Sequence, residues 1–287
     1  MKQLTQYIQE KLQINKDSKI KAHKYYPKDE HELKKIVYEL IKERGEDADL
    51  NDIDTSKVTS MVGIFSYDQF DSSSFNFNGD ISKWDTSNVT NMANLFSWSN
   101  FNGNISNWDV SNVEDMGAMF QHCKFNKDIS RWDVSKVKDM GWMFAGGEFN
   151  QPISKWDVSN VENMESLFNA SNFNQDISSW DVSKVTNMKM LFRKTPFNHK
   201  LSSWDVSNVK NLSEMFMSCD FNQNISDWNV ENCTNFSDMF WGSKFNQNID
   251  KWKINSKAIY FDMFKKSPME NNTPKWYHLD KETNILL

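Results

Sequence analysis

The chain lacks any long apolar run, which excludes one large class of proteins. No stretch of about 18 consecutive apolar residues occurs, and a helix needs roughly that many to cross a bilayer. Residues 1–21 alternate charged side chains with isolated apolar ones and lack the continuous apolar core of a secretion signal. We therefore expect no membrane insertion, and a cytoplasmic location is favoured for the chain as given.

The chain also lacks the motifs from which common active sites are built. It has no glycine-rich phosphate loop, no zinc-ligand spacing and no nucleophile motif. The five histidines form no ligand cluster and share no repeat position; they are His23, His31, His122, His199 and His278. We assign no catalytic residue, cofactor or metal ligand, and we expect that the protein is not an enzyme.

Basic residues are fewer than acidic residues in the central part of the chain. Residues 51–264 hold eighteen Lys and Arg against twenty-six Asp and Glu, whereas residues 1–50 hold eleven against ten. An acidic surface repels phosphate backbones, so we expect no nucleic-acid partner.

What the chain does contain is a repeat of 24 residues. Tryptophans recur at this interval from Trp84 to Trp252, and phenylalanines recur at the same interval from Phe96 to Phe264. Residues 50–65 form a degenerate first copy at an offset of 31, which gives about nine copies in total. A unit of this size cannot bury its apolar face alone, so neighbouring units are expected to stack.

Each unit is predicted to contain a short strand followed by a short helix. In the unit that begins at Phe125, the spacing of Ile129, Trp132 and Val134 favours a strand with Trp132 and Val134 on one side. The next apolar residues follow at helical offsets of 0, 3, 6 and 7; they are Val137, Met140, Met143 and Phe144. The predicted fold class is an α/β repeat, a leucine-rich-repeat-like solenoid of about nine strand-turn-helix units with terminal caps.

The ends of the chain are predicted to close this stack. Residues 29–44 favour an amphipathic helix, with Asp29 as N-cap and Gly45 as the stop signal. We divide the chain into a helical N-terminal cap over residues 1–49, a repeat solenoid over residues 50–264 and an irregular C-terminal cap over residues 265–287.

The repeated string ISxWDVSNVxNMxxMF, followed by FN, resembles the BspA-like leucine-rich-repeat family, which includes the repeats of mycoplasma surface lipoproteins. The resemblance covers about residues 50–264 and whole units rather than isolated positions. It implies a leucine-rich-repeat solenoid located at a cell surface, with adhesion or protein binding as its role. Similar repeats are known in large viruses as well.

An aspartate recurs directly after the tryptophan of most units and is expected to face outward. One interpretation is a face that binds a cation or another ligand. The favoured interpretation is that each carboxylate accepts backbone N–H bonds in its own turn, or pairs with a cation two positions earlier. This acidic row consists of Asp85, Asp109, Asp133, Asp157, Asp181 and Asp205.

Other residues that share a repeat position, here called columns, are interpreted as structural. The asparagines from Asn78 to Asn246 are expected to bond the backbone of the next unit, and the Trp, Phe and Met columns are expected to form the core. Cys123 and Cys219 lie four units apart, too far for a disulfide. A Cys219–Cys233 bridge stays open, although free thiols are favoured.

Partner binding is expected at positions that vary while the scaffold stays fixed. The residue before each tryptophan varies, and Trp142 occupies an outward helical position; an exposed Trp is typical of binding hot spots. For Trp142, exposure and packing against a neighbour are equally favoured, whereas Trp98 and Trp241 are expected to pack against neighbouring loops. The candidate partner-binding residues are Trp142, Lys83, Asp85, Asn107, Asp109, Arg131, Asp133, Lys155 and Asp157.

The leading hypothesis for function is a non-catalytic protein-binding scaffold, adhesion being one form of this role. The identity of the protein partner stays open. The alternative hypothesis is a self-assembling structural component of a virus particle or surface layer, so the choice between a monomer and a self-assembled form is undecided.

Overall fold

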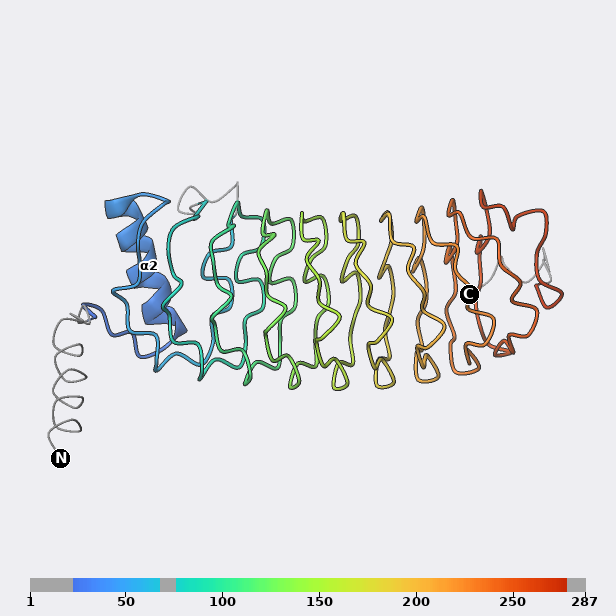
Figure 1. Cartoon of the computed structure of the whole chain (residues 1–287), viewed down its shortest axis with the longest axis horizontal. Coiled ribbons are helices and arrows are strands. Elements are labelled where there is room, and N and C mark those ends of the chain that lie inside the picture. The colour runs from blue at the N-terminus through green and yellow to red at the C-terminus, as the bar shows by residue number, and fades with distance from the viewer. Residues whose placement is uncertain (1–22, 68–75, 278–287) are drawn as a thin grey trace, which may run out of the picture.

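The structure is a computed structural model that describes residues 23–67 and 76–277. Coils of the chain lie in single file, with helix α2 at one end and the last coils at the other (Figure 1). Helix α2 spans Glu30–Arg44, and the described residues contain no other helix and no β-strand. The architecture is therefore a stack of irregular coils closed at its N-terminal end by one helix.

Helix α2 forms where the sequence predicted a helix. The Asp29 side chain caps its start by accepting the backbone N–H of Glu32 at 2.9 Å. At its end Gly45, with φ of +90°, donates its N–H to the carbonyl of Ile41 at 2.7 Å. The buried face consists of Leu33, Val37, Leu40 and Ile41. No helix in the described part of the chain is long and apolar enough to span a membrane.

Neighbouring coils are joined by backbone hydrogen bonds from alternate residues. Met140 and Trp142 donate their N–H groups to carbonyls of the next coil, at 3.0 Å and 2.7 Å, whereas Met143 donates to the carbonyl of Met140 and closes a turn. One parallel bridge links each pair of coils at this place, at intervals of 24 residues from Asn91 to Ile259. Each coil is thus held mainly by its two neighbours, as the repeat predicted.

The predicted fold class, an α/β solenoid of strand-turn-helix units, is wrong. The helix expected over residues 137–144 does not form, because Trp142 has a left-handed backbone with φ of +61°. Residues at the same repeat position share this conformation; they are Asn94, Ala118, Ser166, Met190, Glu214, Asp238 and Asp262. A series of tight turns buries the same side chains that a helical face would bury, so the apolar spacing alone did not distinguish the two.

The predicted strand over Ile129–Val134 is also absent, because consecutive turns replace it. Trp132 donates its N–H to the carbonyl of Ile129 at 3.1 Å, and Val137 donates to the carbonyl of Val134 at 2.9 Å. A strand would direct these backbone groups to a neighbouring strand instead. The predicted side-chain directions nevertheless hold, since Trp132 and Val134 are buried and Asp133 between them is exposed.

The aromatic columns form the core, as predicted. The rings of Phe96 and Phe120 stack with centroids 5.6 Å apart, and those of Trp84 and Trp108 stack at 6.3 Å. Each buried indole N–H donates to a carbonyl of the preceding coil, as Trp132 does to Ile105 at 3.3 Å. The indole rings are therefore buried without leaving their polar N–H groups unpaired.

The asparagine column is structural, as predicted. The side-chain oxygen of Asn102 accepts the backbone N–H of Asn126 at 3.0 Å, and the same bond recurs in successive coils up to Asn246. The three cysteines are free and buried, as favoured from the sequence, and burial raises the pKa of the Cys219 and Cys233 thiols to about 11. These cysteines therefore act as small apolar core residues.

The C-terminal end keeps the repeat longer than the sequence suggested. Trp276 lies 24 residues after Trp252, stacks on it at 6.3 Å and donates its indole N–H to the carbonyl of Ile249. On the last coil, Ile259 and Phe261 are 57% and 53% exposed, whereas polar residues occupy these positions in the preceding coil.

Candidate functional site

The acidic row serves local turns. Each of its carboxylates accepts the backbone N–H of the serine two residues later, as Asp133 accepts that of Ser135 at 3.0 Å. The same bond occurs at Asp85, Asp109, Asp157, Asp181 and Asp205. The favoured interpretation from the sequence, that each carboxylate bonds its own turn, is therefore confirmed.

These turn bonds also lower the pKa of three carboxylates of the row. Hydrogen bonds from the side chain and backbone of Ser135 lower the pKa of Asp133, and the equivalent serines lower the pKa of Asp109 and Asp181. Within the described residues, no three His, Cys, Asp or Glu side chains are grouped as ligands of one metal ion. The row is thus an anionic edge of the stack built from separate turns.

Two of the candidate partner-binding residues share one pocket. Asn107 and Arg131 line a depression of about 230 Å³ between two neighbouring coils. Its other lining residues are Asn104, Ser106, Lys127 and Asp128. Lys83 and Lys155, from the same column as Arg131, are exposed on coils to either side and do not line this pocket.

Trp142 lies on a turn. Its left-handed backbone donates to the carbonyl of Glu165 in the next coil, and the side chain is half-buried. The sequence placed it on the outward face of a helix, and that placement is wrong because the helix does not exist. It lies in the left-handed column described above, on the face where the coils are bridged.

The most exposed tryptophan among the described residues is Trp98, which was expected to pack against a loop. Its side chain is 56% exposed, and one face of its ring stacks on His122 with centroids 3.9 Å apart. His122 lies one repeat later at the same position, so two consecutive units present an aromatic ring there. That recurrence was the signal in the sequence that could have identified the pair.

The ring of His122 continues this stack over a glycine. A Cβ atom placed on Gly146, again one repeat later, would lie 2.3 Å from the His122 imidazole. Only glycine fits beneath the ring at this left-handed position, where φ is +65°. Burial lowers the pKa of His122, so the neutral ring is favoured. We call Trp98, His122 and Gly146 the aromatic stack.

Trp241 occupies a different environment from Trp98. Its side chain is half-buried, and the ammonium group of Lys266 lies 4.5 Å from the centre of its ring. This cation–π contact comes from the next coil and covers the ring, in agreement with the expected packing against a neighbour.

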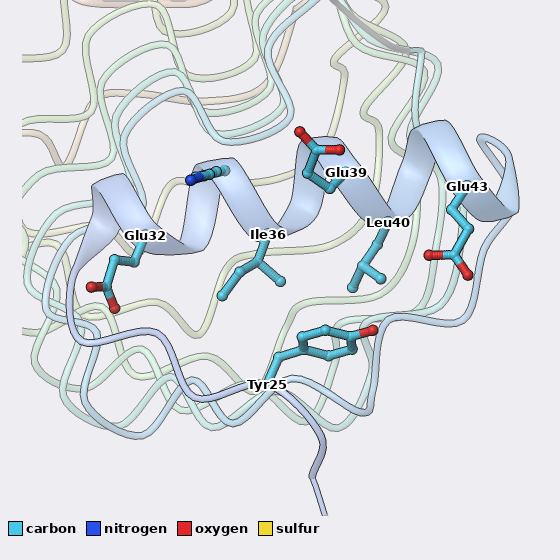
Figure 2. A pocket seen from close by; sticks show the side chains of 7 residues that line it. Tyr25, Glu32, Ile36, Glu39, Leu40 and Glu43 are labelled. Carbon is cyan, nitrogen blue, oxygen red and sulfur yellow. The ribbon is translucent and has the colours of Figure 1, made fainter.

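A second candidate surface lies beside helix α2, away from the columns considered in the sequence. Tyr25, on the segment that precedes the helix, faces Ile36 and Leu40 across a groove of about 460 Å³ (Figure 2). Glu32 and Glu43 mark the two ends of the groove along the helix. Glu39 and Lys35 complete its lining. The groove therefore combines an apolar floor with a mainly acidic rim.

Comparison with known proteins identifies one family. The model of DUF285, described as a Mycoplasma protein of unknown function, matches four overlapping segments, which are residues 32–147, 68–172, 97–195 and 169–276. The match agrees with the expected likeness to mycoplasma repeats, but it carries no BspA or leucine-rich-repeat name. No curated protein and no solved structure was found to match. Because the matched segments together run from residue 32 to residue 276, the chain belongs to the repeat-containing DUF285 family, whose function is unknown.

Proposed function

We propose that the chain is a non-catalytic scaffold that binds a protein partner through the aromatic stack, with Trp98 as the anchor. The observation that carries this proposal is the exposure of Trp98, 56% of a large apolar side chain, on a hydrogen-bonded framework. Exposed aromatic side chains are costly in water and dominate the energetics of many protein interfaces.

The aromatic stack is preorganised for binding. Trp98 has a left-handed backbone with φ of +61°, its N–H is bonded to the carbonyl of Gln121 at 2.7 Å, and one ring face lies on His122. A side chain that is already ordered loses little conformational entropy when a partner covers its free face. Trp142, which is half-buried at the left-handed repeat position that begins with Asn94, offers a further aromatic contact.

Two observations support a role without catalysis. The thiols, which are the strongest potential nucleophiles, are buried with raised pKa values and so are poorly reactive. The recurrent carboxylates of the acidic row are bonded into their own turns. Such groups stabilise the scaffold and leave the variable surface positions for recognition.

The test uses the full chain as an immobilised bait with two variants. Trp98→Ala removes the anchor, and Lys194→Ala is the matched control, because Lys194 is exposed at the same repeat position four coils later. A protein recovered by the wild type is purified and its Kd is measured for all three chains. We expect Trp98→Ala to raise Kd at least tenfold and Lys194→Ala to change it less than twofold.

Circular dichroism and melting temperature establish that the variants keep the fold. If every recovered partner bound the Trp98→Ala chain as tightly as the wild type, the aromatic stack would not be the binding site and the proposal would be wrong. Binding weakened equally by both variants would also contradict it, because the effect would not be specific to the aromatic ring.

One observation favours self-assembly as a second candidate function. Ile259 and Phe261 are exposed on the last described coil, where the preceding coil has Asn235 and Ser237. An apolar end surface of this kind favours contact with another copy of the chain. Sedimentation velocity over a hundredfold range of concentration tests it: we expect association for the wild type and its loss in Phe261→Ser. A monomer at all concentrations would contradict this candidate.

A further inference from the structure

The depression that Arg131 lines holds two positive charges that the fold leaves unpaired. Within the described part of the chain, the side chains of Lys127 and Arg131 form no hydrogen bond and no ion pair. Several lysines of other coils pair with a carboxylate of the preceding coil, as Lys138 does with Glu114 at 2.7 Å. The two cations of the depression are therefore free to bind an anionic group of a ligand.

Lys127 departs from the bonding pattern of its repeat position. In later coils this position holds glutamine or histidine, whose side chain bonds to the asparagine of the preceding coil; Gln151, for example, donates to Asn126 at 3.0 Å. The preceding unit has Gly103 here and offers no side chain to meet Lys127. Lys127 therefore lines the depression instead of joining two coils. The residues that keep the bond in the later coils are Gln175, His199, Gln223 and Gln247.

The remaining lining groups can form hydrogen bonds. Asn104 and Asp128 each accept the backbone N–H of the serine two residues later, at 3.1 Å and 2.8 Å, and both side chains are exposed. Asn107 and Ser106 add an amide and a hydroxyl group. Hydrogen bonds from Ser130 lower the pKa of Asp128, so this carboxylate is ionised at neutral pH. The depression thus offers neutral donors and a charged acceptor beside its two cations.

The balance of charge favours a ligand with a single negative charge. Two cations and one carboxylate give the lining a net charge of one positive unit. A phosphate group carries about 1.5 to 2 negative charges at pH 7 and would be repelled by Asp128. A carboxylate carries one charge, and its two oxygens match the fork of N–H donors on Arg131. The lining is therefore better suited to a carboxylate.

We propose that this depression binds a hydroxylated carboxylate, such as a sugar acid. The carboxylate binds to Arg131 and Lys127. The hydroxyl groups bond to the neutral donors and the acceptor, which are Asn107, Ser106 and Asp128. The volume of about 230 Å³ lies below the roughly 300–1,000 Å³ of sites for drug-sized ligands, so one small unit is expected. The site includes no residue of the aromatic stack and is independent of the partner proposed there.

The experiment is a titration of the full chain with D-glucuronate, followed by the NMR amide signals of residues 104–107 and 127–131. We expect saturable shifts with a Kd of about 1–5 mM at low salt, and weaker binding as salt screens the charges. Glucose lacks the carboxylate and acetate lacks the hydroxyl groups, so each should bind at least about fivefold more weakly. Lack of saturation by glucuronate would overturn the proposal, and so would tighter binding of glucose, acetate or inorganic phosphate.

Methyl β-D-glucuronide distinguishes two sources of this chemistry, because its anomeric oxygen is blocked as in a polysaccharide. A Kd equal to that of glucuronate would support the proposal with a uronate unit of a polysaccharide as the ligand. Binding of the free acid alone would support it with a free sugar acid as the ligand.

Substitution tests the depression as the place of binding. The double variant Lys127→Gln, Arg131→Gln is expected to keep the fold, because glutamine occupies the position of Lys127 in later coils, and to raise Kd at least about tenfold. The control is Lys155→Gln, since Lys155 is exposed in the column of Arg131 but does not line the depression. It should change Kd less than about twofold. Melting temperatures verify the fold of each variant.

An unchanged Kd in the folded double variant would overturn the proposal, and so would an equal loss in the control, which would indicate a general effect of charge. Trp98→Ala should bind glucuronate as the wild type does. A failure of this site and a failure of the aromatic stack can therefore be told apart.

Discussion

The indole ring of Trp98 lies face to face with the imidazole of His122, one repeat later in the sequence, with centroids 3.9 Å apart and planes inclined by 28°. The left-handed backbone recurs at this repeat position from Trp98 to Lys266, so side chains in two consecutive units can lie next to each other. Two consecutive rings therefore stack without any further adjustment of the fold, and the outer ring is left with one free face.

His122 should make the stability of the fold depend on pH near neutrality. Burial lowers its pKa, so the folded state binds the proton less readily than the unfolded chain does. The contribution of His122 to stability is therefore fully present above about pH 6.5, the ordinary pKa of His, and is lost as pH falls below that value. We expect the melting temperature of the wild type to fall more steeply between pH 7.5 and 5.5 than that of His122→Gln.

Removal of one indole N–H should cost stability. In Trp180→Phe, the carbonyl of Ile153 loses the indole donor at 3.1 Å but keeps the backbone N–H of Trp156, and a small cavity opens. We expect a loss of about 1–3 kcal/mol in the free energy of unfolding, measured by urea denaturation. Asp181→Asn, an exposed change at the next residue, should cost much less. A neutral Trp180→Phe would show that the indole bond contributes little.

The acidic row should depend on a hydrogen-bond acceptor at each position and not on its charge. Asp133→Asn keeps an acceptor oxygen for the N–H of Ser135, and Asn229 already fills this role in a later coil, where it accepts the N–H of Glu231. We expect Asp133→Asn to be close to neutral and Asp133→Ala to cost about 1 kcal/mol in urea denaturation. Equal losses in both would indicate that the charge is required.

The left-handed columns should accept glycine with a gain in stability. Ala170 is exposed with φ of +54°, a conformation that strains every residue with a Cβ atom. Ala170→Gly should raise the free energy of unfolding by about 0.5–1 kcal/mol. Ala93→Gly is the control, because Ala93 is outside the left-handed positions, and it should lower stability by a similar amount. Destabilisation by both substitutions would contradict the left-handed assignment.

Much of the architecture could be predicted from periodicity, because burial follows repeat position. The spacing identified the stack, the core columns, the asparagine bonds and the helix that ends at Arg44. The same spacing could not distinguish a helix from a series of turns, because Val137, Met140 and Phe144 are buried in either case. The difference lies in the backbone of Trp142, and nothing in that side chain indicates a left-handed conformation.

The candidate site was predicted less well, for a related reason. The candidate set combined one variable column with part of the acidic row and Trp142, and the structure brings Asn107 and Arg131 of that set into a common pocket. The exposure of Trp98 depends on the residue at the same repeat position in the next coil. That contact can be inferred only when the left-handed positions are known. The groove at Ile36 depends on the segment at Tyr25, which runs beside the helix, and no sequence signal predicts that position.

The recurrent bonds between coils allow a gene of this kind to gain or lose whole repeats. Met140, Trp142 and Phe144 bond to the next coil through backbone groups, which every residue type except proline provides. Recombination between two copies of the repeat in the DNA would therefore add or remove whole coils and keep these backbone bonds at each junction. Such a gene can change the length of the stack between generations. The two ends of the stack, α2 and the coil of Trp276, stay unaltered.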